Sequence, residues 1–593
     1  MSITVELKGI VSKALNSLYE LNIPSEEVLV NGTKPEFKGD YTIVLFAYTK
    51  PVRKSPEVIG NELGNYLLEN HKEFITGFNV IKGFLNLSIA DSYWLGFLQQ
   101  SFSNSSFGKA ERLQNKVMVE YSSPNTNKPL HLGHLRNNFL GWSIGAVLNS
   151  VGYDVVKTCI VNDRGVHICK SMIAWQLFGN GATPASTNTK GDHFVGDYYV
   201  KFNDEYKLQV KELIAAGKTQ EEAEKEAPIM KATQQMLIDW EAGKPAVMEL
   251  WKTMNGWVYE GFDTTYNKIG SDFDKTYYES NTYLLGKDLV EQGLEKKVFF
   301  QKDDGSVWID LTADGLDEKL VRRKDGTSVY ITQDIGLAEQ KQKEFGAEKS
   351  IYVVGDEQNY HFKVLKLICE KLRLPSAEGI YHLSYGMVEL PTGKMKSREG
   401  TVVDADDLVD EMIAIAAQKT EELGKVKDFT AAELEKLHNI IGLGALKFFL
   451  LRVDPKKKMI FNPEESIDFH GFTGPFIQYT HARIKSILRK FELDNNKELE
   501  ATQPLLLLEK QLIIHIELFG AVLQESAADL DPSKLAVYIF NLVKLFNSLY
   551  AEHSFGNAES EEKKILRLKM AQLTATVIKT GMNILGIEVP ERM

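Results

Sequence analysis

"KVMVEYSSPNTNKPLHLGHLRNNFLGWSIGAVLNSVGYDVVKTCIV", residues 116–161, has the pattern strand, turn, helix, strand. The end segments "KVMVEYSS" and "DVVKTCIV" are short apolar runs typical of buried strands, and "LGWSIGAVLNSV" has apolar residues at helical spacing up to Gly152. The stretch therefore predicts a βαβ unit whose crossover begins at the His-Leu-Gly-His motif, residues 131–134. Such a motif lies at a strand's carboxyl end and a helix's amino end, where open parallel sheets bind ligands.

Two kinds of ligand suit this motif. His131 and His134 share a helix face and could bind zinc, but Leu132 and Gly133 between them offer no carboxylate to activate water. Phosphate fits better, because a helix amino terminus presents unpaired N–H groups and Gly133 lets a phosphate approach the backbone. The two imidazoles add donors that could stabilise a transition state in which pyrophosphate leaves an α-phosphate. We assign no metal-ligating residues.

Composition restricts the class of protein. With 593 residues and 43% apolar content, about three to five domains are expected, and a net charge of -12 argues against a sequence-indifferent polyanion binder. The three cysteines form no Cys-x-x-Cys pair, which favours a reducing, cytoplasmic location. The first twenty residues lack the apolar core of a signal peptide, and no later apolar run approaches about 18 residues, so no membrane association is expected.

The sequence pattern predicts a Rossmann-type parallel-sheet α/β domain between an N-terminal α+β domain and a C-terminal all-α helical bundle. Residues 1–112 contain the strand pattern "GFLNLSIA" and end in the polar linker "SFSNSSFGKAERLQNK". Residues 113–390 form the expected catalytic domain, with a charged helical insertion at about 187–262. Strands are expected to resume in "KVFFQ", "GSVWIDLT", "SVYITQD" and "SIYVVGDEQ". Residues 391–464 follow, and residues 465–593 read as long amphipathic helices with a break at Pro532.

One of these late helices carries a basic strip beside an aromatic residue. In "GPFIQYTHARIKSILRKF" the apolar stripe is most simply the core of the domain. Arg483, Lys485, Arg489 and Lys490 lie on the remaining faces beside Tyr479, which suggests RNA binding. An ordinary solvated face explains the segment alone equally well.

A second segment, "GMVELPTGKMKSREGTV" at residues 386–402, is a glycine-flanked cationic loop that looks like the other half of a nucleotide site. Together the two segments resemble the paired signatures of class I aminoacyl-tRNA synthetases. Further short segments resemble one branch, the arginyl-tRNA synthetases: "SSPNTNKPLHLGHLRN", "YITQDIG", "VVGDEQNYHF", "GPFIQYTHAR" and the final "PERM". The resemblance spans nearly the whole chain.

The resemblance implies an arginine–tRNA ligase, which forms arginyl-adenylate and pyrophosphate from L-arginine and ATP with Mg²⁺, and then charges the 3'-terminal ribose of tRNA. No protein-bound zinc is expected, because the sequence has no Cys-x-x-Cys pair. The expected site residues, most of them implied by the resemblance, fall into four groups. The catalytic group is Lys128, His131, His134 and Lys394; ATP also meets Gly133 and Met395; arginine meets Glu120, Asn125, Tyr330, Asp334 and Gln358; and tRNA meets Phe84, Asn86, Tyr479 and Arg483. Phe84 alone could equally be a core residue, and no heptad stripe suggests a dimer, so a monomer is expected.

The chemistry of the arginine pocket can be argued from its residues. A guanidinium needs a carboxylate acceptor and tolerates an aromatic face, which Asp334 and Tyr330 offer. If "YITQD" is a strand, both side chains lie on one face, and Gln358 arrives from the end of the next strand. Simple sheet packing is the alternative explanation for Tyr330.

The second signature departs from the usual Lys-Met-Ser-Lys-Ser, because its fourth position is Ser397. One cation expected near the leaving pyrophosphate is therefore missing. Lys128, three residues before His131, is the natural substitute, and Lys396 is the competing candidate.

Two other classes of protein remain as alternatives. A nucleotidyltransferase of the pantothenate-ligase type could use the same first motif, although it needs no helical terminal domain of ~130 residues. A catalytically silent RNA-binding paralogue is the second alternative, and its pocket would have no need to be complete.

Overall fold

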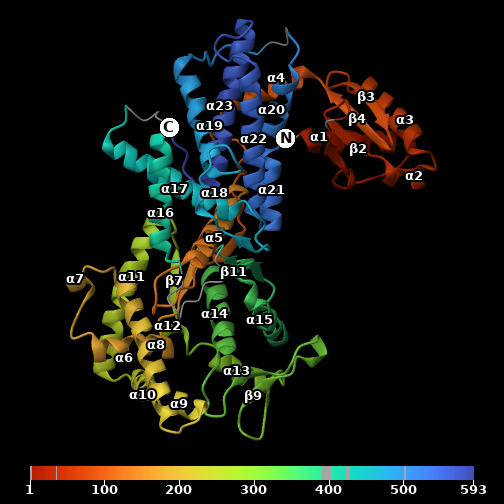
Figure 1. Ribbon diagram of the computed structural model, residues 1–593. Helices are drawn as coiled ribbons and strands as arrows, with labels where there is room; N and C mark the ends of the chain where they lie inside the picture. The colour runs from red at the N-terminus through yellow and green to blue at the C-terminus, as the bar shows by residue number, and fades with distance from the viewer. Residues whose placement is uncertain (1–2, 35, 390, 392–402, 423–427, 500–502) are drawn as a thin grey trace.

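The computed structural model describes residues 3–593 except 35, 390, 392–402, 423–427 and 500–502. Its described helices and strands form an N-terminal lobe, a central sheet with two lower lobes, and a long helical bundle (Figure 1). Among the described residues, no helix is both long enough and apolar enough to cross a membrane.

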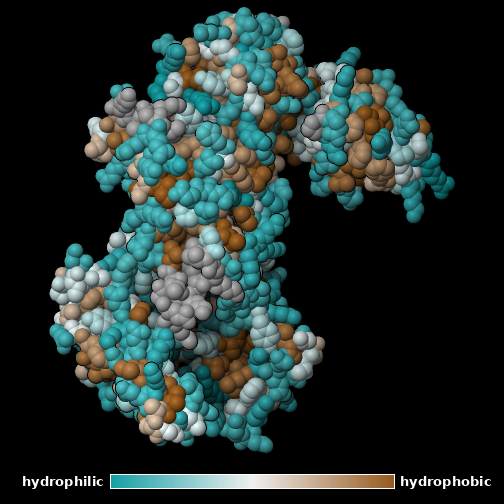
Figure 2. Space-filling view, in the orientation of Figure 1, coloured by the Kyte–Doolittle hydropathy of each residue, from teal (hydrophilic) through white to brown (hydrophobic). Residues whose placement is uncertain are grey.

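The N-terminal lobe is the expected α+β domain. Its antiparallel sheet has the order β1-β2-β4-β3. The elements are α1 (Ile3–Tyr19), β1 (Val30–Gly32), β2 (Tyr41–Val44), α2 (Phe46–Val52), α3 (Pro56–Asn70), β3 (Ile75–Ile81), β4 (Phe84–Ile89) and α4 (Asp91–Ser101). The polar linker follows without helix or strand before the next strand begins at Lys116. In the space-filling view of Figure 2 this lobe projects to the right of the helical bundle.

The central sheet is a doubly wound parallel sheet, as expected for a Rossmann-type domain. Its order is β12-β11-β5-β6-β7, and each neighbouring pair is parallel. Its strands and crossover helices are β5 (Lys116–Glu120), α5 (Leu132–Ser150), β6 (Asp154–Val161), β7 (Lys275–Tyr278), α14 (Tyr330–Phe345), β11 (Lys349–Gly355), α15 (Asn359–Leu372) and β12 (Ile380–Tyr385). The strand order reverses between β5 and β11, and such a switch point is where open α/β sheets bind ligands.

Helix α5 packs closely on β5 because it carries Gly141. A Cβ atom there would lie 2.4 Å from the side chain of Tyr121, the residue after β5. The carboxyl half of α5 continues into the helical bundle, where Ser143 Oγ donates to the carbonyl oxygen of Ile584 at 3.2 Å. One helix thus joins the central sheet to the bundle.

Helices occupy the expected insertion and extend somewhat beyond residues 187–262. They follow α6 (Val166–Phe178) and are α7 (Pro184–Thr187), α8 (Gly191–Ala215), α9 (Gln220–Glu226), α10 (Pro228–Glu241) and α11 (Pro245–Ile269). They form one lower lobe of the molecule (Figure 1).

The strands expected after the insertion need two corrections. "KVFFQ" and "GSVWIDLT" do contain strands, but these form a separate antiparallel sheet of order β10-β9-β8. "SVYITQD" is wrong as a strand, because α14 begins at Tyr330, and Ile331, Ile335 and Ala338 are buried at helical spacing. The elements of this second lower lobe are α12 (Glu279–Thr282), α13 (Lys287–Glu295), β8 (Phe300–Gln301), β9 (Val307–Ile309) and β10 (Lys319–Arg322).

The bundle is all-helical after residue 465, as expected. Asp531 caps α22 through a hydrogen bond from the Ser533 N–H, and Pro532 is the first residue of that helix. The elements from the sheet onward are β13 (Val388–Glu389), α16 (Ala405–Glu422), α17 (Ala431–Leu451), β14 (Met459–Ile460), α18 (Pro463–Ser466), α19 (Gly474–Lys490), α20 (Leu507–Glu517), α21 (Phe519–Asp529), α22 (Pro532–Glu552) and α23 (Glu561–Ile584). In α19, Ile477, Ile484 and Ile487 are buried, which confirms the predicted core stripe.

Candidate active site and RNA-binding surfaces

The first motif lies at the switch point of the sheet. It follows β5, and His131 is the N-cap of α5. The Gly133 N–H donates to His131 Nδ1, and the His131 N–H donates to His134 Nδ1, each at 3.1 Å. The two imidazoles therefore form a capping box, with ring centroids 3.9 Å apart.

The predicted phosphate contact with free backbone N–H groups of this helix is wrong in detail. The Leu132 N–H donates to the carbonyl oxygen of Val403, and the His134 N–H donates to the carbonyl oxygen of His131. With Gly133 also engaged, the first three donors of the helix are occupied. Close packing explains the glycine at position 133 instead, because a Cβ atom there would lie 3.0 Å from the His131 ring.

The imidazoles themselves become the available donors. Burial lowers the pKa of His131 to about 4, with a further contribution from the charge of Lys128, and burial also lowers the pKa of His134 well below its ordinary value. Both rings are therefore neutral at pH 7. Because each Nδ1 accepts a hydrogen bond, each ring must carry its proton on Nε2. The motif offers two neutral Nε2–H donors.

The loop between β5 and the motif has an unusual backbone. Ser122 and Ser123 both have positive φ, 83° and 37°. Asn137 accepts a hydrogen bond from the Ser122 N–H through Oδ1 and donates to the carbonyl oxygen of Val353 at 2.7 Å. Strained backbone of this kind persists where neighbouring groups fix it, often at functional sites. Here the second turn of α5 fixes the loop to the end of β11.

The three residues expected to bind the guanidinium lie on helical segments rather than on strands. Tyr330 is the first residue of α14 and Asp334 lies one turn later, so the two still share a face. Tyr330 is 70% exposed, which excludes sheet packing as its explanation. Gln358 ends the short helical turn Asp356–Gln358 that follows β11 at the carboxyl edge of the sheet.

Glu120 lies at the end of β5, but its carboxylate is already paired. It is 6% exposed, accepts a hydrogen bond from the Lys341 ammonium of α14, and lies 3.3 Å from Thr158 Oγ1. Both groups engage Oε2 of Glu120, so the expected contact of this residue with arginine stays a prediction. Asn125, also expected there, is half-buried and pairs through its backbone with Asn162 after β6.

Two residues near Asp334 were not predicted from the sequence. His361 Nε2 lies 2.6 Å from Asp334 Oδ2, and Glu279 at the start of α12 is close enough to Asp334 to interact electrostatically. Burial raises the pKa of the Glu279 carboxyl to about 7. His361 stands in the quoted word "VVGDEQNYHF", so its signal was present, whereas the signal for Glu279 was only its place after a strand.

The second signature lies outside the described residues, and with it Lys394, Met395, Lys396 and Ser397. The chain is described again from Val403. There it pairs with the first motif: the Ala405 N–H donates to the carbonyl oxygen of Leu130 at 3.0 Å, and His131 and Asp404 form an isolated bridge.

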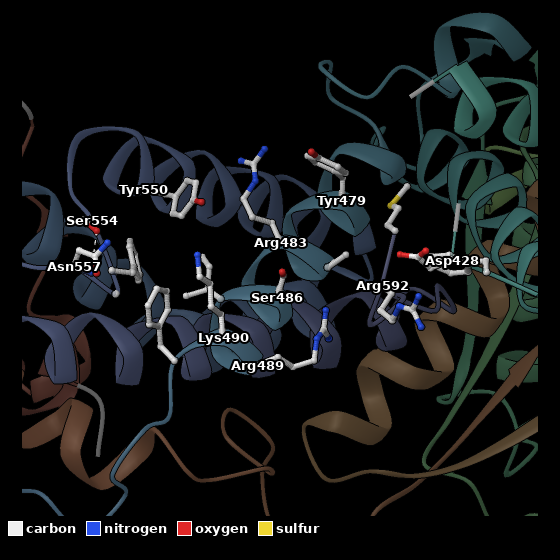
Figure 3. A pocket seen from close by; sticks show the side chains of 17 residues that line it. Asp428, Tyr479, Arg483, Ser486, Arg489, Lys490, Tyr550, Ser554, Asn557 and Arg592 are labelled. Carbon is white, nitrogen blue, oxygen red and sulfur yellow. Dashed lines mark hydrogen bonds between the residues drawn. The ribbon is translucent and has the colours of Figure 1, made fainter. Parts of the chain in front are cut away.

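The predicted basic strip lines a cavity of about 780 Å³ in the bundle (Figure 3). The Arg483 guanidinium lies 4.9 Å from the Tyr479 ring and 5.5 Å from the Tyr550 ring. Arg489 and Lys490 also line this cavity, whereas Lys485 turns toward Glu591 at 3.2 Å and lines a neighbouring cavity. Cations and tyrosine rings in one groove suit the phosphates and bases of RNA.

The two expected contacts of the N-terminal lobe differ in exposure. Phe84 is 37% exposed and packs edge-on against Phe46, whose ring centroid is 5.5 Å away. Asn86 is 1% exposed, and its amide group is hydrogen-bonded to Thr42 and Asn79 within the sheet. A direct RNA contact by the Asn86 side chain does not agree with this burial.

The family models that match this chain show its class of protein. Residues 98–462 match the family model for "tRNA synthetases class I (R), catalytic domain", and residues 477–593 match the "DALR anticodon binding domain". The chain therefore has the catalytic domain of a class I aminoacyl-tRNA synthetase. Residues 5–89 match the "Arginyl tRNA synthetase N terminal domain".

Relatives that match this chain over their whole length identify the family within this class. The chain is 52% identical to the arginine–tRNA ligases of Flavobacterium psychrophilum and Bacteroides thetaiotaomicron, with all of both chains covered. The arginyl-tRNA synthetase of Thermus thermophilus has the same fold, with a TM-score of 0.77, 24% identity and 99% of each chain covered. That of Plasmodium falciparum matches with a TM-score of 0.78 at 18% identity, covering 100% and 99%. The chain belongs to the arginyl-tRNA synthetase family.

Proposed function

We propose a division of roles among the residues of this arginine–tRNA ligase. The observation that carries it is the position, at the carboxyl edge of one sheet, of two neutral imidazole donors on α5 and of an α14 carboxylate held by His361 after β11. The donors suit a phosphate that gains charge, and the carboxylate suits a guanidinium. Activation of arginine by ATP needs both.

For the ATP step, the Nε2–H groups of His131 and His134 donate to the α-phosphate as pyrophosphate leaves. Their neutrality is useful, because a neutral donor remains in place without a counter-ion and strengthens its hydrogen bond only as the phosphate gains charge. Lys128 adds a cation beside them, since its charge contributes to the lowered pKa of both rings. Lys394 and Met395 complete the ATP site by family resemblance. Mg²⁺ enters as the complex with ATP, as part of the substrate.

For arginine, Asp334 and Gln358 bind the guanidinium and the exposed ring of Tyr330 covers it. Asn125 binds the amino-acid end, and Glu279 supplies a second carboxylate. Glu120 joins Asn125 at the amino-acid end, and its pair with Lys341 also ties the end of β5 to the helix that carries Asp334. A carboxylate pocket of this kind accepts arginine and rejects a neutral side chain, which cannot form charge-assisted hydrogen bonds with the carboxylate.

For tRNA, Phe84 of the N-terminal lobe contacts the elbow, and Tyr479 and Arg483 contact the anticodon region in the cavity of Figure 3. We place the domain boundaries at 1–112, 113–390, 391–464 and 465–593. We propose a monomer in the cytoplasm, in agreement with its three buried, unpaired cysteines.

The test is charging of bulk tRNA with each of the twenty amino acids, together with arginine-dependent exchange of pyrophosphate into ATP. Arginine alone should be charged, and the exchange should require an intact Asp334. Charging with another amino acid would overturn the arginine assignment. Binding of tRNA without any exchange would favour a silent RNA-binding paralogue.

A further inference from the structure

The amino end of α8, the long helix of the insertion, contacts the segment just before the first motif and the segment that follows the second signature. On one side Gly196 faces the first motif, since a Cβ atom there would lie 2.8 Å from Pro129. On the other side α8 faces Asp404 and Asp406, just after the second signature. The insertion is thus placed where it can affect two segments that lie ~270 residues apart in sequence.

These contacts are ionic. His193 Nε2 lies 3.2 Å from Asp404 Oδ2 and 3.3 Å from Asp406 Oδ2. The Lys190 ammonium lies 2.6 Å from Asp406 Oδ2 and 3.0 Å from the fully buried Asp192. The adjacent carboxylates of Asp404 and Asp406 raise the pKa of His193 to about 10, so this imidazole is protonated at neutral pH. We call these five residues the α8 cluster.

Asp192, His193 and Asp406 are close enough together to bind a metal ion. The ammonium of Lys190 already contacts both of these carboxylates, and His193 adds a second positive charge. Two cations among three carboxylates nearly balance the cluster without an ion. Hydrogen bonds from Lys190 and Thr265 further engage the Asp406 carboxylate.

Asp404 also connects the cluster to the first motif. Its Oδ1 accepts from the N–H groups of Asp406 and Asp407 at the start of α16. Its backbone lies in the short segment Val403–Ala405 that pairs with Leu130–Leu132, where Val403 accepts the first N–H of α5. Movement of Asp404 would therefore free a donor at the amino end of α5 and disturb the His131 cap.

We propose that His193 and Lys190 of the insertion are positioning residues for arginine activation, which keep the segment after the second signature paired with the first motif. This inference rests on the proposed role of His131 and His134 in the ATP step. Without the His193 charge, Lys190 alone would face three carboxylates, and their repulsion would loosen the pairing of Val403–Ala405. Small displacements of catalytic groups reduce rates by up to about a hundredfold.

The experiment compares His193→Gln, Asp404→Asn and the double variant in the full-length protein. Each single variant should lower kcat/KM for ATP in pyrophosphate exchange about tenfold or more, with the KM for arginine changed less than about twofold. The double variant removes one charge of each sign, so its loss should be clearly smaller than the product of the two single losses. Asparagine can still cap α16.

Two further measurements separate positioning from general destabilisation. Hydrogen exchange of a peptide covering residues 403–412 should be faster in His193→Gln, while peptides of β5 and β11 should keep their protection. The matched control is Lys201→Gln on the same helix, which removes an exposed pair with Glu205 at 2.7 Å and should leave all readouts unchanged.

The inference is overturned if His193→Gln keeps kcat/KM for ATP within twofold, or if the double variant loses the full product of the single losses. It is also overturned if EDTA alone speeds exchange of the 403–412 peptide in the parent chain, since an ion would then hold the cluster. If the parent chain shows no pyrophosphate exchange at all, the proposed function is refuted instead. The hydrogen-exchange measurement would then still test whether His193 maintains the pairing of residues 403–405.

Discussion

His361 Nε2 lies 2.6 Å from Oδ2 of Asp334, so a residue of α15 fixes the carboxylate that α14 presents to the proposed arginine pocket. A carboxylate can only accept, and the imidazole must therefore donate from Nε2. The second oxygen, Oδ1, is left to accept from a guanidinium. The pocket is in this sense prepared before arginine arrives.

Asp334→Asn should weaken arginine binding strongly while the fold stays intact. Loss of the counter-charge of a guanidinium in such a pocket typically costs about 3–5 kcal/mol, a factor of hundreds or more. Arginine titrations of pyrophosphate exchange measure the effect, and the exposed Asp317→Asn serves as the control. Near-normal use of arginine by folded Asp334→Asn protein would refute the pocket.

Arginine affinity should increase between pH 6 and pH 8 because of Glu279. Its carboxyl has a pKa of about 7, so it is mostly neutral below that pH and negatively charged above it. Only the charged form attracts arginine, and affinity should rise by up to about tenfold per pH unit below the pKa. Calorimetric titration across this range measures it. The profile should flatten in Glu279→Gln, and an unchanged slope in that variant would exclude the assignment.

The α8 cluster should contribute to stability in a defined pH window. The pKa of His193 is raised from 6.5 to about 10, so its contribution is complete below pH 6.5 and is lost as the pH rises toward 10. The difference in free energy of unfolding between the parent chain and His193→Gln should therefore shrink from pH 7 to pH 10. Denaturant titrations at several pH values measure it. A difference that grows with pH would contradict the assigned charge.

Binding of tRNA should depend on salt through the cavity of Figure 3, despite the net charge of -12. Each of Arg483→Gln and Lys490→Gln should flatten the slope of log affinity against log salt by about one unit or less. Lys485→Gln should do less, because Lys485 already pairs with Glu591. Lys534→Gln, at an exposed pair elsewhere in the bundle, is the control. Equal slopes in all four variants would mean that the cavity has another purpose.

The sequence predicted those parts of the fold that depend on neighbouring residues. The βαβ unit of residues 116–161, the helical insertion and the core stripe of α19 all follow from local periodicity. "SVYITQD" failed because its apolar residues fit a strand as well as a helix over so short a stretch. Tyr330 and Asp334 do share a face, as expected, but on a helix and not on the predicted strand. Residues four apart lie on one face in both kinds of secondary structure.

Contacts between distant segments could not be predicted. The Leu132 N–H is occupied by Val403, and Glu120 by Lys341, each more than 200 residues away. No local pattern indicates such partners, so the expectation of free helix donors was wrong and the Glu120–Lys341 pair was not foreseen. The neutral state of His131 and His134 likewise follows from burial, which appears only once the chain has folded.

Lys128→Ala should slow adenylate formation about 100- to 1000-fold, since loss of one donor to a developing negative charge commonly adds about 2.7–4 kcal/mol to the barrier. Lys128 is chosen because the second signature has Ser397 where a lysine is usual, so one cation is missing there. Lys128 is also close enough to His131 for its charge to lower the pKa of that imidazole. The rate constant should fall far more than ATP affinity, because the interaction strengthens in the transition state. Single-turnover adenylation with tRNA present measures both quantities, with Lys201→Gln as the control. If Lys128→Ala keeps its rate and Lys396→Ala loses it, the compensating cation belongs to the second signature.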